Sequence, residues 1–288
     1  MTTPTAPAQA TVWDDAHLTR AAFSHVISGA DGFLRMRLDV DDPAEVWADA
    51  CHSDVDYGPR ITALRLDPSR IPAKAEANGW RFIIPGDSEW PASLDQLGTE
   101  APIGLWVSGP AHLEAASQGR DAVAFAGPRL STDENRALAD KIGRCLADNA
   151  KTLITGLALG AQGHTLEAAL DHGGRIVAAT SGRAVFSGAA ALSARIAESG
   201  ALVSHRPFDV VATRDDYAQT MRVVAALADA LVYCDAPARS TAPVALKTAA
   251  KLQRRLIVQV GSDIADLDAV VETFTSAADL LQVLDPEA

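Results

Sequence analysis

The sequence predicts an α/β protein: a Rossmann-like parallel sheet covered by helices on both faces and preceded by a small helical domain. Six short apolar segments recur between residues 122 and 260. Segments with helical periodicity separate them, and this alternation is typical of βαβ units. Aromatic residues make up only 5% of the chain. Ala, Val, Leu and Ile must therefore fill the core, as in buried strands under Ala-rich helices.

Strands and helices of the predicted sheet alternate along the chain. We expect strands at residues 122–126, 152–155, 175–179, 201–204, 230–234 and 256–260. We expect helices at residues 132–149, 162–172, 188–199, 217–228 and 243–252. Two more strands are expected before this series, at residues 82–84 and 103–108, with a short helix between them that has Pro91 at its start.

The chain divides into four expected parts. Residues 1–12 are rich in Thr, Ala and Pro and are expected to be a disordered leader without signal-peptide character. Residues 13–78 show helical spacing of apolar residues and are expected to form the small helical domain. Residues 79–262 are expected to form the Rossmann-like domain, with 79–118 as its N-terminal extension. Residues 263–288 are expected to be a helical tail.

Several protein classes are disfavoured by the composition. The three cysteines are far apart and form no CxxC or Cys/His pattern, so neither a disulfide framework nor a zinc site is predicted. No segment approaches the length of uncharged apolar chain that a transmembrane helix needs. We expect a cytoplasmic protein with no cofactor, no metal and no membrane partner.

The net charge of −12 does not by itself favour nucleic acid as a partner. The segment from Asp121 to Val270, however, holds 16 basic and 16 acidic residues, so the excess negative charge lies entirely outside it. A local basic face on the Rossmann-like domain is therefore compatible with the composition.

The first candidate site is the turn after the first strand of the series. Gly127 lets a ligand approach the backbone closely, and the guanidinium of Arg129 adds paired N–H donors at the same turn. Ser131 or Thr132 can cap the helix that follows. Such a turn suits a phosphate at a helix N-terminus, although a capped turn with a solvated arginine has the same sequence.

The second candidate site is the glycine-rich turn after the next strand. It contains Thr155, Gly156, Ala158, Gly160 and, at the start of the helix, His164. The glycines let a ligand or another backbone come close, but the turn is neither GxGxxG nor a P-loop. The position of His164 favours a polar residue at a helix start over a residue that contacts a ligand.

The third candidate site follows the fourth strand of the series. Arg206, Arg214 and Arg222 lie within 17 residues and could line a groove that tracks phosphates. Nearby aspartates dilute this charge, so a solvated surface stays open as an alternative. We found no GxSxG, HExxH or paired-carboxylate pattern, so no catalytic residues are predicted.

Longer motifs connect these turns. They are P-G-D-S-E-W-P at 85–91, A-P-I-G-L-W-V at 101–107, G-P-R at 127–129, T-G-L-A at 155–158, E-A-A-L at 167–170, G-A-L-V-S at 200–204 and A-A-L-A at 225–228. In this order they resemble the DprA/Smf DNA-processing family, most of all its actinobacterial members. The resemblance spans roughly residues 80–262.

The resemblance implies a homodimer that binds single-stranded DNA at the strand ends and delivers it to the RecA recombinase, in transformation and recombination. It implies no enzymatic activity. The family's Gly-Ser-Arg turn corresponds to residues 127–129, and its Ser-Gly-x-Ala-x-Gly turn to residues 155–160. Its Arg-Asn-Arg motif is retained only at Arg222.

The sequence also departs from the family. Ala161 and Gln162 replace an Ile-Asp pair, Leu166 replaces a His, and the loop at 180–187 lacks a Tyr-Pro pair. These losses leave a second hypothesis open, namely a nucleotide sensor or a relative of the Lonely Guy phosphoribohydrolases that uses the same anion-binding turns. Residues 163–167 (G-H-T-L-E) partly match that group's Gly-Thr-x-x-Glu. A third hypothesis is a degenerate paralogue that only dimerises with a partner. We favour DNA binding.

Overall fold

The computed structural model describes residues 11–54, 57–129, 132–234, 236, 240–264 and 267–285. Residues 1–10 of the expected leader lie outside this range. Thr11, in contrast, is fixed on the first strand of the sheet: its hydroxyl donates to the carbonyl of Phe82 at 3.0 Å and accepts from the N–H of the same residue at 2.8 Å.

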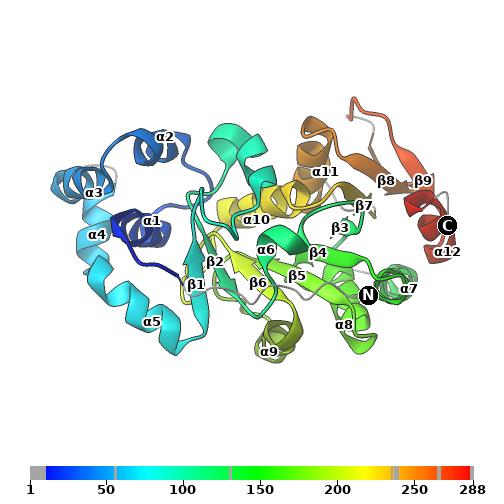
Figure 1. The fold of residues 1–288 in the computed structure, drawn as a ribbon. Coiled ribbons are helices and arrows are strands. Elements are labelled where there is room, and N and C mark those ends of the chain that lie inside the picture. Colours follow the sequence, from blue (N-terminus) through cyan, green and yellow to red (C-terminus); the bar gives the residue numbers. More distant parts are fainter. Residues whose placement is uncertain are drawn as a thin grey trace.

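The N-terminal part is helical, as predicted. Its helices are α1 (Asp15–Val26), α2 (Gly32–Val40), α3 (Pro43–His52), α4 (Gly58–Leu64) and α5 (Ile71–Ala77). Aspartate side chains begin the first three: Asp14, Asp31 and Asp42 each accept a hydrogen bond from a backbone N–H in the first turn. These helices lie together at one side of the molecule, beside the edge of the sheet (Figure 1).

One nine-stranded sheet runs through the rest of the molecule, in the order β1-β2-β6-β5-β4-β3-β7-β8-β9 (Figure 1). Its parallel part contains the predicted series, namely β3 (Ala122–Ala126), β4 (Thr152–Gly156), β5 (Arg175–Thr180), β6 (Ala201–Ser204), β7 (Ala230–Tyr233) and β8 (Arg255–Gln259). The prediction of an α/β Rossmann-like fold is confirmed.

An antiparallel pair extends this sheet. It consists of β1 (Trp80–Ile83) and β2 (Leu105–Ser108), with the short helix η2 (Ala92–Glu100) between them. β2 pairs antiparallel with β6, so Trp106 faces Ser204 in the register. The sheet is therefore mixed: strand β6 is parallel to β5 on one side and antiparallel to β2 on the other.

The prediction of a purely helical tail is wrong. The tail contributes strand β9 (Glu272–Phe274), which pairs parallel with β8, before helix α12 (Ala277–Leu284) begins. Only Phe274 of this strand is buried, so its three residues carry no apolar run that periodicity could detect.

Helices cover both faces of the sheet. The helices on one face are α7 (Asp133–Asp148), α8 (Ala161–Asp171), α9 (Ala189–Ser199) and α12. The other face carries α10 (Arg214–Ala226), α11 (Ala242–Lys251), η2 and the one-turn helix α6 (Leu113–Ala116). Side chains alternate along the central strand β3. Val123 and Phe125 belong to the core under α7, α8, α9 and α12, and Ala124 belongs to the core under α10 and α11. Small residues toward α10 and α11 let these helices pack closely.

Two absences apply to the described residues alone. None of their helices is both long and apolar enough to cross a membrane. No three of their His, Cys, Asp or Glu side chains are grouped so that they could hold a metal ion.

Candidate nucleic-acid interface

The carboxyl ends of the parallel strands place several loops at one edge of the sheet. Strands β4, β5 and β6 lie on one side of β3, and β7 and β8 lie on the other. The order of strands in the sheet therefore reverses between β3 and β7, although these two strands are parallel. Open α/β sheets bind ligands beside such a switch point. The turn that starts at Gly127 borders it, and here the N–H of Cys234 donates to the carbonyl of Ala126 at 3.0 Å.

Arg129 is exposed in this turn and makes no hydrogen bond or ion pair with any residue that the structure describes. Thr132 caps α7, and its hydroxyl accepts from the N–H of Asn135 at 3.2 Å. Ser131 lies outside the described residues. The turn thus presents a guanidinium to solvent next to a capped helix start, which suits an anion.

The glycine-rich turn packs against the first turn. A Cβ on Gly160, whose φ is +85°, would lie 2.2 Å from the carbonyl oxygen of Arg129. The N–H of Ala161 donates to the carbonyl of Pro128 at 2.9 Å. Gly127 also lies against the second turn, since a Cβ on Gly127 would lie 3.0 Å from the Cβ of Ala161. These glycines therefore serve the contact between two turns, one of the two uses that the sequence left open.

Other residues of the second turn face inward or sideways. Thr155 is fully buried, and its hydroxyl donates to the carbonyl of Phe125 at 2.7 Å. Gly156 lies over α10, where a Cβ would meet the Met221 methyl at 2.8 Å. Ala158 is half-buried. His164 is also half-buried, with its Nδ1 3.9 Å from a carboxylate oxygen of Asp140 on α7. None of these offers a second exposed cation beside Arg129.

The motif that resembles the phosphoribohydrolases is not assembled into a site. The Thr165 hydroxyl is buried and donates to the carbonyl of Ala161 at 2.8 Å, within its own helix. Glu167 is exposed. Two residues apart on a helix, these side chains point in different directions.

The three arginines of the third stretch are separated. Arg206 is buried: it donates to the carbonyl of Ser24 on α1 at 2.7 Å, and its Nε lies 3.6 Å from the carboxylate of Asp216. The expectation that Arg206 lines an exposed groove is therefore not met, because this side chain joins α1 to the sheet. Arg222 forms an ion pair with Glu100 at 2.9 Å. Arg214, the first residue of α10, is exposed and makes no ion pair within the described residues.

Asp216 organises the junction around Arg206. It is fully buried and accepts hydrogen bonds from the N–H groups of Gly29, at 2.9 Å, and Thr213, at 2.8 Å. Burial opposes its ionisation, but hydrogen bonds from His205 and from these N–H groups hold the pKa of the carboxyl well below its ordinary value. Burial lowers the pKa of His205. The buried pair is therefore a neutral imidazole beside a carboxylate.

Arg183 is a candidate that the sequence interpretation missed. It lies in the loop after β5, is exposed, and makes no side-chain hydrogen bond or ion pair among the described residues. Its N–H donates to the carbonyl of Val210 at 2.9 Å, and the N–H of Gly182 donates to the Ser204 hydroxyl at 2.9 Å. These bonds fix the loop while the guanidinium stays in solvent. Its position in the short loop after a buried strand was the available signal.

Three exposed arginines thus follow three strands of the parallel part of the sheet. Arg129 follows β3, Arg183 follows β5, and Arg214 lies beyond β6 at the start of α10. Strands β3 and β6 are three positions apart in the sheet order. At about 4.8 Å per position, the loops span about 14 Å of sheet edge. We call these three arginines the arginine row. Arg129 and Arg183 precede helices of one face, α7 and α9, whereas Arg214 begins α10 on the other face.

Comparison with known proteins decides the family. Residues 81–282 match the family described as DNA recombination-mediator protein A. The chain belongs to this family. A DNA processing protein DprA of Mycobacterium tuberculosis is 34% identical over 177 residues, which are 57% of this chain and 45% of that protein. Protein Smf of Synechocystis is 25% identical over 200 residues, 66% of this chain and 48% of that protein. The matches thus span about half of each relative. The resemblance to the DprA/Smf family, including an actinobacterial member, is confirmed.

Solved structures of this family share the fold. DprA of Streptococcus pneumoniae superimposes with a TM-score of 0.69 at 18% identity, over 94% of this chain and 98% of that one. DNA processing protein A of Helicobacter pylori, whose structure was described for its mode of binding single-stranded DNA, gives 0.59 at 18% identity, over 72% and 96%. The DprA fold thus includes the sheet that carries the arginine row.

The contact between the turns at 127–129 and 155–160 can be tested by substituting Gly160. We expect Gly160→Ala to lower the free energy of unfolding by about 1–3 kcal/mol, because the residue combines a positive φ with a clash against the backbone at Arg129. Urea unfolding measures this. Gly173→Ala is the matched control, since Gly173 has φ +68° and nothing within 4 Å of the added Cβ. Equal losses in the two variants would contradict tight packing of the turns.

Proposed function

We propose that this protein binds single-stranded DNA along the carboxyl edge of its sheet, through Arg129, Arg183 and Arg214. The observation that carries the proposal is their common position: all three are exposed, lack an ion pair among the described residues, and follow strands of the parallel part of the sheet. Guanidinium groups bind phosphates through paired donors, and such contacts give affinity without sequence preference.

Two further observations support this proposal. The part of the chain from Asp121 to Val270 has no net charge, although the whole chain carries −12. Arg214 also begins a 13-residue helix, whose N-terminal dipole favours an anion. The family membership and the single-strand binding of the Helicobacter pylori relative agree with this class of ligand.

The proposal extends to the setting in which DNA is bound. We infer a cytoplasmic DNA-binding protein rather than an enzyme, acting as a homodimer that passes single strands to the RecA recombinase in recombination or transformation. The family description as a recombination mediator supports this role. Light scattering would test the dimer, and RecA filament assembly on strands covered by a single-strand-binding protein would test the transfer.

The direct test is the binding of a labelled oligothymidylate, followed by fluorescence anisotropy. Three arginine–phosphate contacts predict a slope of about −2 for log affinity against log salt. Affinity should therefore fall about 20-fold between 50 and 200 mM salt, as estimated from that slope. A single strand should bind more tightly than its duplex. Absence of binding at the lower salt, or a preference for duplex, would overturn the proposal.

A further inference from the structure

Helix α2 carries three exposed apolar side chains on one face. Phe33 is 68% exposed, Met36 is 56% exposed and Val40 is 80% exposed. Their spacing along the helix places them in one row, which we call the α2 stripe. The opposite side of α2 is buried through Leu34 and Leu38. Single exposed apolar side chains are common on protein surfaces, whereas a continuous row of them is typical of a surface that binds a partner.

A groove between α2 and α3 adjoins the α2 stripe. Its volume is about 420 Å³, and Phe33 forms part of its wall. Phe23 and Val46 close its base: they are 0% and 1% exposed and offer no surface to a partner. The apolar surface that stays accessible in the groove belongs to Phe33 and to the half-buried Tyr57. A side chain placed in the groove would therefore contact these two rings.

Acidic residues surround the stripe and the groove. Residues 31–54 contain seven acidic and two basic residues, which gives a net charge of −5. Both basic residues, Arg35 and Arg37, are held in ion pairs with aspartates. Glu45 is exposed and makes no ion pair among the described residues. It lies one turn before Asp49 of the groove wall. The surface is therefore negative, and its two cations are already paired.

This charge distinguishes between possible occupants. The phosphates of nucleic acids and of anionic lipids would be repelled. A second copy of the chain would place the same negative face opposite itself, because a two-fold interface pairs like with like. A partner that carries Lys or Arg beside its apolar residues is complementary.

The walls of the groove indicate the conformation of this partner. Both walls are helices, α2 and α3, so they offer no strand edge to which an extended segment could add. An amphipathic helix can instead lay its apolar face along the row and into the groove. The two helices lie at the side of the molecule away from β8 and β9, where Figure 1 shows no other element over α2.

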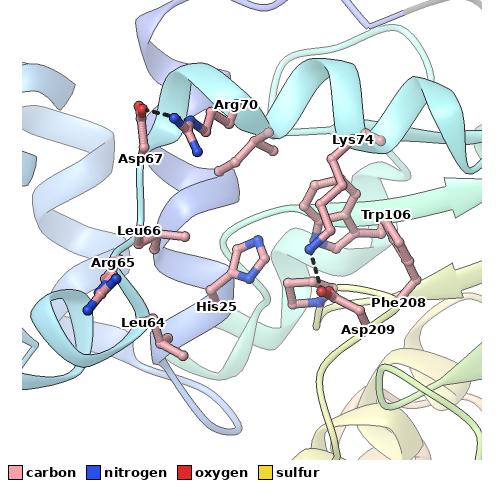
Figure 2. Close-up of a pocket in the computed structure, with 13 residues that line it drawn as sticks. His25, Leu64, Arg65, Leu66, Asp67, Arg70, Lys74, Trp106, Phe208 and Asp209 are labelled. Carbon is pink, nitrogen blue, oxygen red and sulfur yellow. Dashed lines mark hydrogen bonds and ion pairs between the residues drawn. The ribbon is translucent and has the colours of Figure 1, made fainter.

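The other cavity of the N-terminal part, shown in Figure 2, does not offer its aromatic rings in this way. Trp106 is 1% exposed. Phe208 is stacked on Trp80, with 5.6 Å between the ring centroids, and the Nζ of Lys74 lies 5.9 Å from the Phe208 centroid. Lys74 also pairs with Asp209. These groups are thus engaged within the molecule, whereas the aromatic ring of the α2 stripe is exposed.

We propose that the α2 stripe and the adjoining groove dock a basic amphipathic helix of a partner protein. One apolar side chain of that helix enters the groove beside Phe33 and Tyr57, and those of the next turns pack on Met36 and Val40. Its Lys and Arg side chains face the surrounding carboxylates. The flexible thioether of Met36 lets this surface adapt to the helix. The inference is independent of the proposed DNA binding, which uses the carboxyl edge of the sheet.

The probe is a labelled peptide of about 18 residues, long enough to form a helix, with leucines at helical spacing and lysines elsewhere. Fluorescence anisotropy measures its affinity for the full chain. We expect Phe33→Ser to lower this affinity about tenfold and Val40→Ser about threefold. Val270→Ser is the matched control for the second variant, because Val270 is 93% exposed and lies outside the N-terminal helices. It should leave the affinity unchanged.

Charge reversal tests the choice of a basic partner. Glu45→Lys should lower the affinity for the peptide about fivefold at low salt, because it places a cation beside the groove. Glu76→Lys makes the same change of net charge on the exposed side of α5 and should have less than about a twofold effect. Equal effects of the two reversals would show that net charge alone attracts the peptide, and would contradict the inference.

Two further peptides distinguish docking from other kinds of binding. A peptide of the same composition in scrambled order should bind at least about tenfold more weakly, and one with Glu in place of Lys should not bind. Equal binding of the scrambled peptide, or an unchanged affinity in Phe33→Ser, would overturn the proposed docking site. A dimer of the chain that is lost in Phe33→Ser would make the stripe a self-interface and would also contradict it. Affinity for oligothymidylate should be the same in Phe33→Ser and in the unchanged protein.

Discussion

Replacement of Arg129, Arg183 and Arg214 together by alanine is expected to lower the affinity for single-stranded DNA on the order of 100-fold at low salt. The reason is the loss of the guanidinium groups that the carboxyl edge presents without an ion-pair partner among the described residues. The slope of log affinity against log salt should move from about −2 toward zero, because each lost phosphate contact removes about 0.7. Anisotropy titrations at several salt concentrations measure both quantities.

A control for this triple variant must remove the same charge elsewhere. Arg120, Lys141 and Arg144 are exposed and lie outside the loops of the carboxyl edge. Their replacement by alanine changes the net charge equally, so affinity and slope should stay close to those of the unchanged protein. If both triple variants lost affinity alike, net charge and not the arginine row would determine binding.

Removal of the Asp216 carboxylate is expected to have the largest effect on stability. Asp216→Ala should lower the free energy of unfolding by about 3–5 kcal/mol, because it leaves Arg206 buried without its counter-ion. The variant also deprives the N–H groups of Gly29 and Thr213 of their acceptor. Urea unfolding at neutral pH measures the loss.

Two comparisons show whether the buried charge causes this loss. Asp215→Ala alters the exposed neighbouring carboxylate and should change stability by no more than about 0.5 kcal/mol. Adding Arg206→Met to Asp216→Ala removes the unpaired charge and should restore part of the lost stability. A double variant no more stable than Asp216→Ala alone would contradict this explanation.

Much of the fold could be predicted because its signals are local. The apolar runs at 122–126 and 152–155 are buried on both faces, and glycine follows the ends of α8 and α9, at Gly173 and Gly200. Strand β9 gave no such signal, since Glu272 and Thr273 are exposed and only Phe274 enters the core. Strand β2 pairs antiparallel with β6, so that Trp106 lies opposite Ser204. Local sequence patterns do not predict a pairing between strands so distant in sequence.

The candidate site could be predicted only in part, since exposure of a basic side chain depends on its distant neighbours. Arg129 and Arg206 each follow a strand, and sequence alone does not distinguish them. Arg206 is buried because the carbonyl of Ser24, 182 positions earlier, accepts its hydrogen bond. Arg222 is paired because η2 brings Glu100 to it. Arg183 was missed because no motif contains it. Its loop is nevertheless held by backbone hydrogen bonds to Val210 and to the Ser204 hydroxyl.

The junction of α1 with the sheet has a consequence for communication within the molecule. Asp216 holds the backbone at Gly29 and lies two residues from Arg214, while Arg206 holds the carbonyl of Ser24. A displacement of α1 is therefore transmitted through buried, charged hydrogen bonds to the start of α10. A molecule that binds the N-terminal helices and displaces them would also move Arg214. Under the proposed function, in which Arg214 contacts DNA, the two binding events would then be thermodynamically linked.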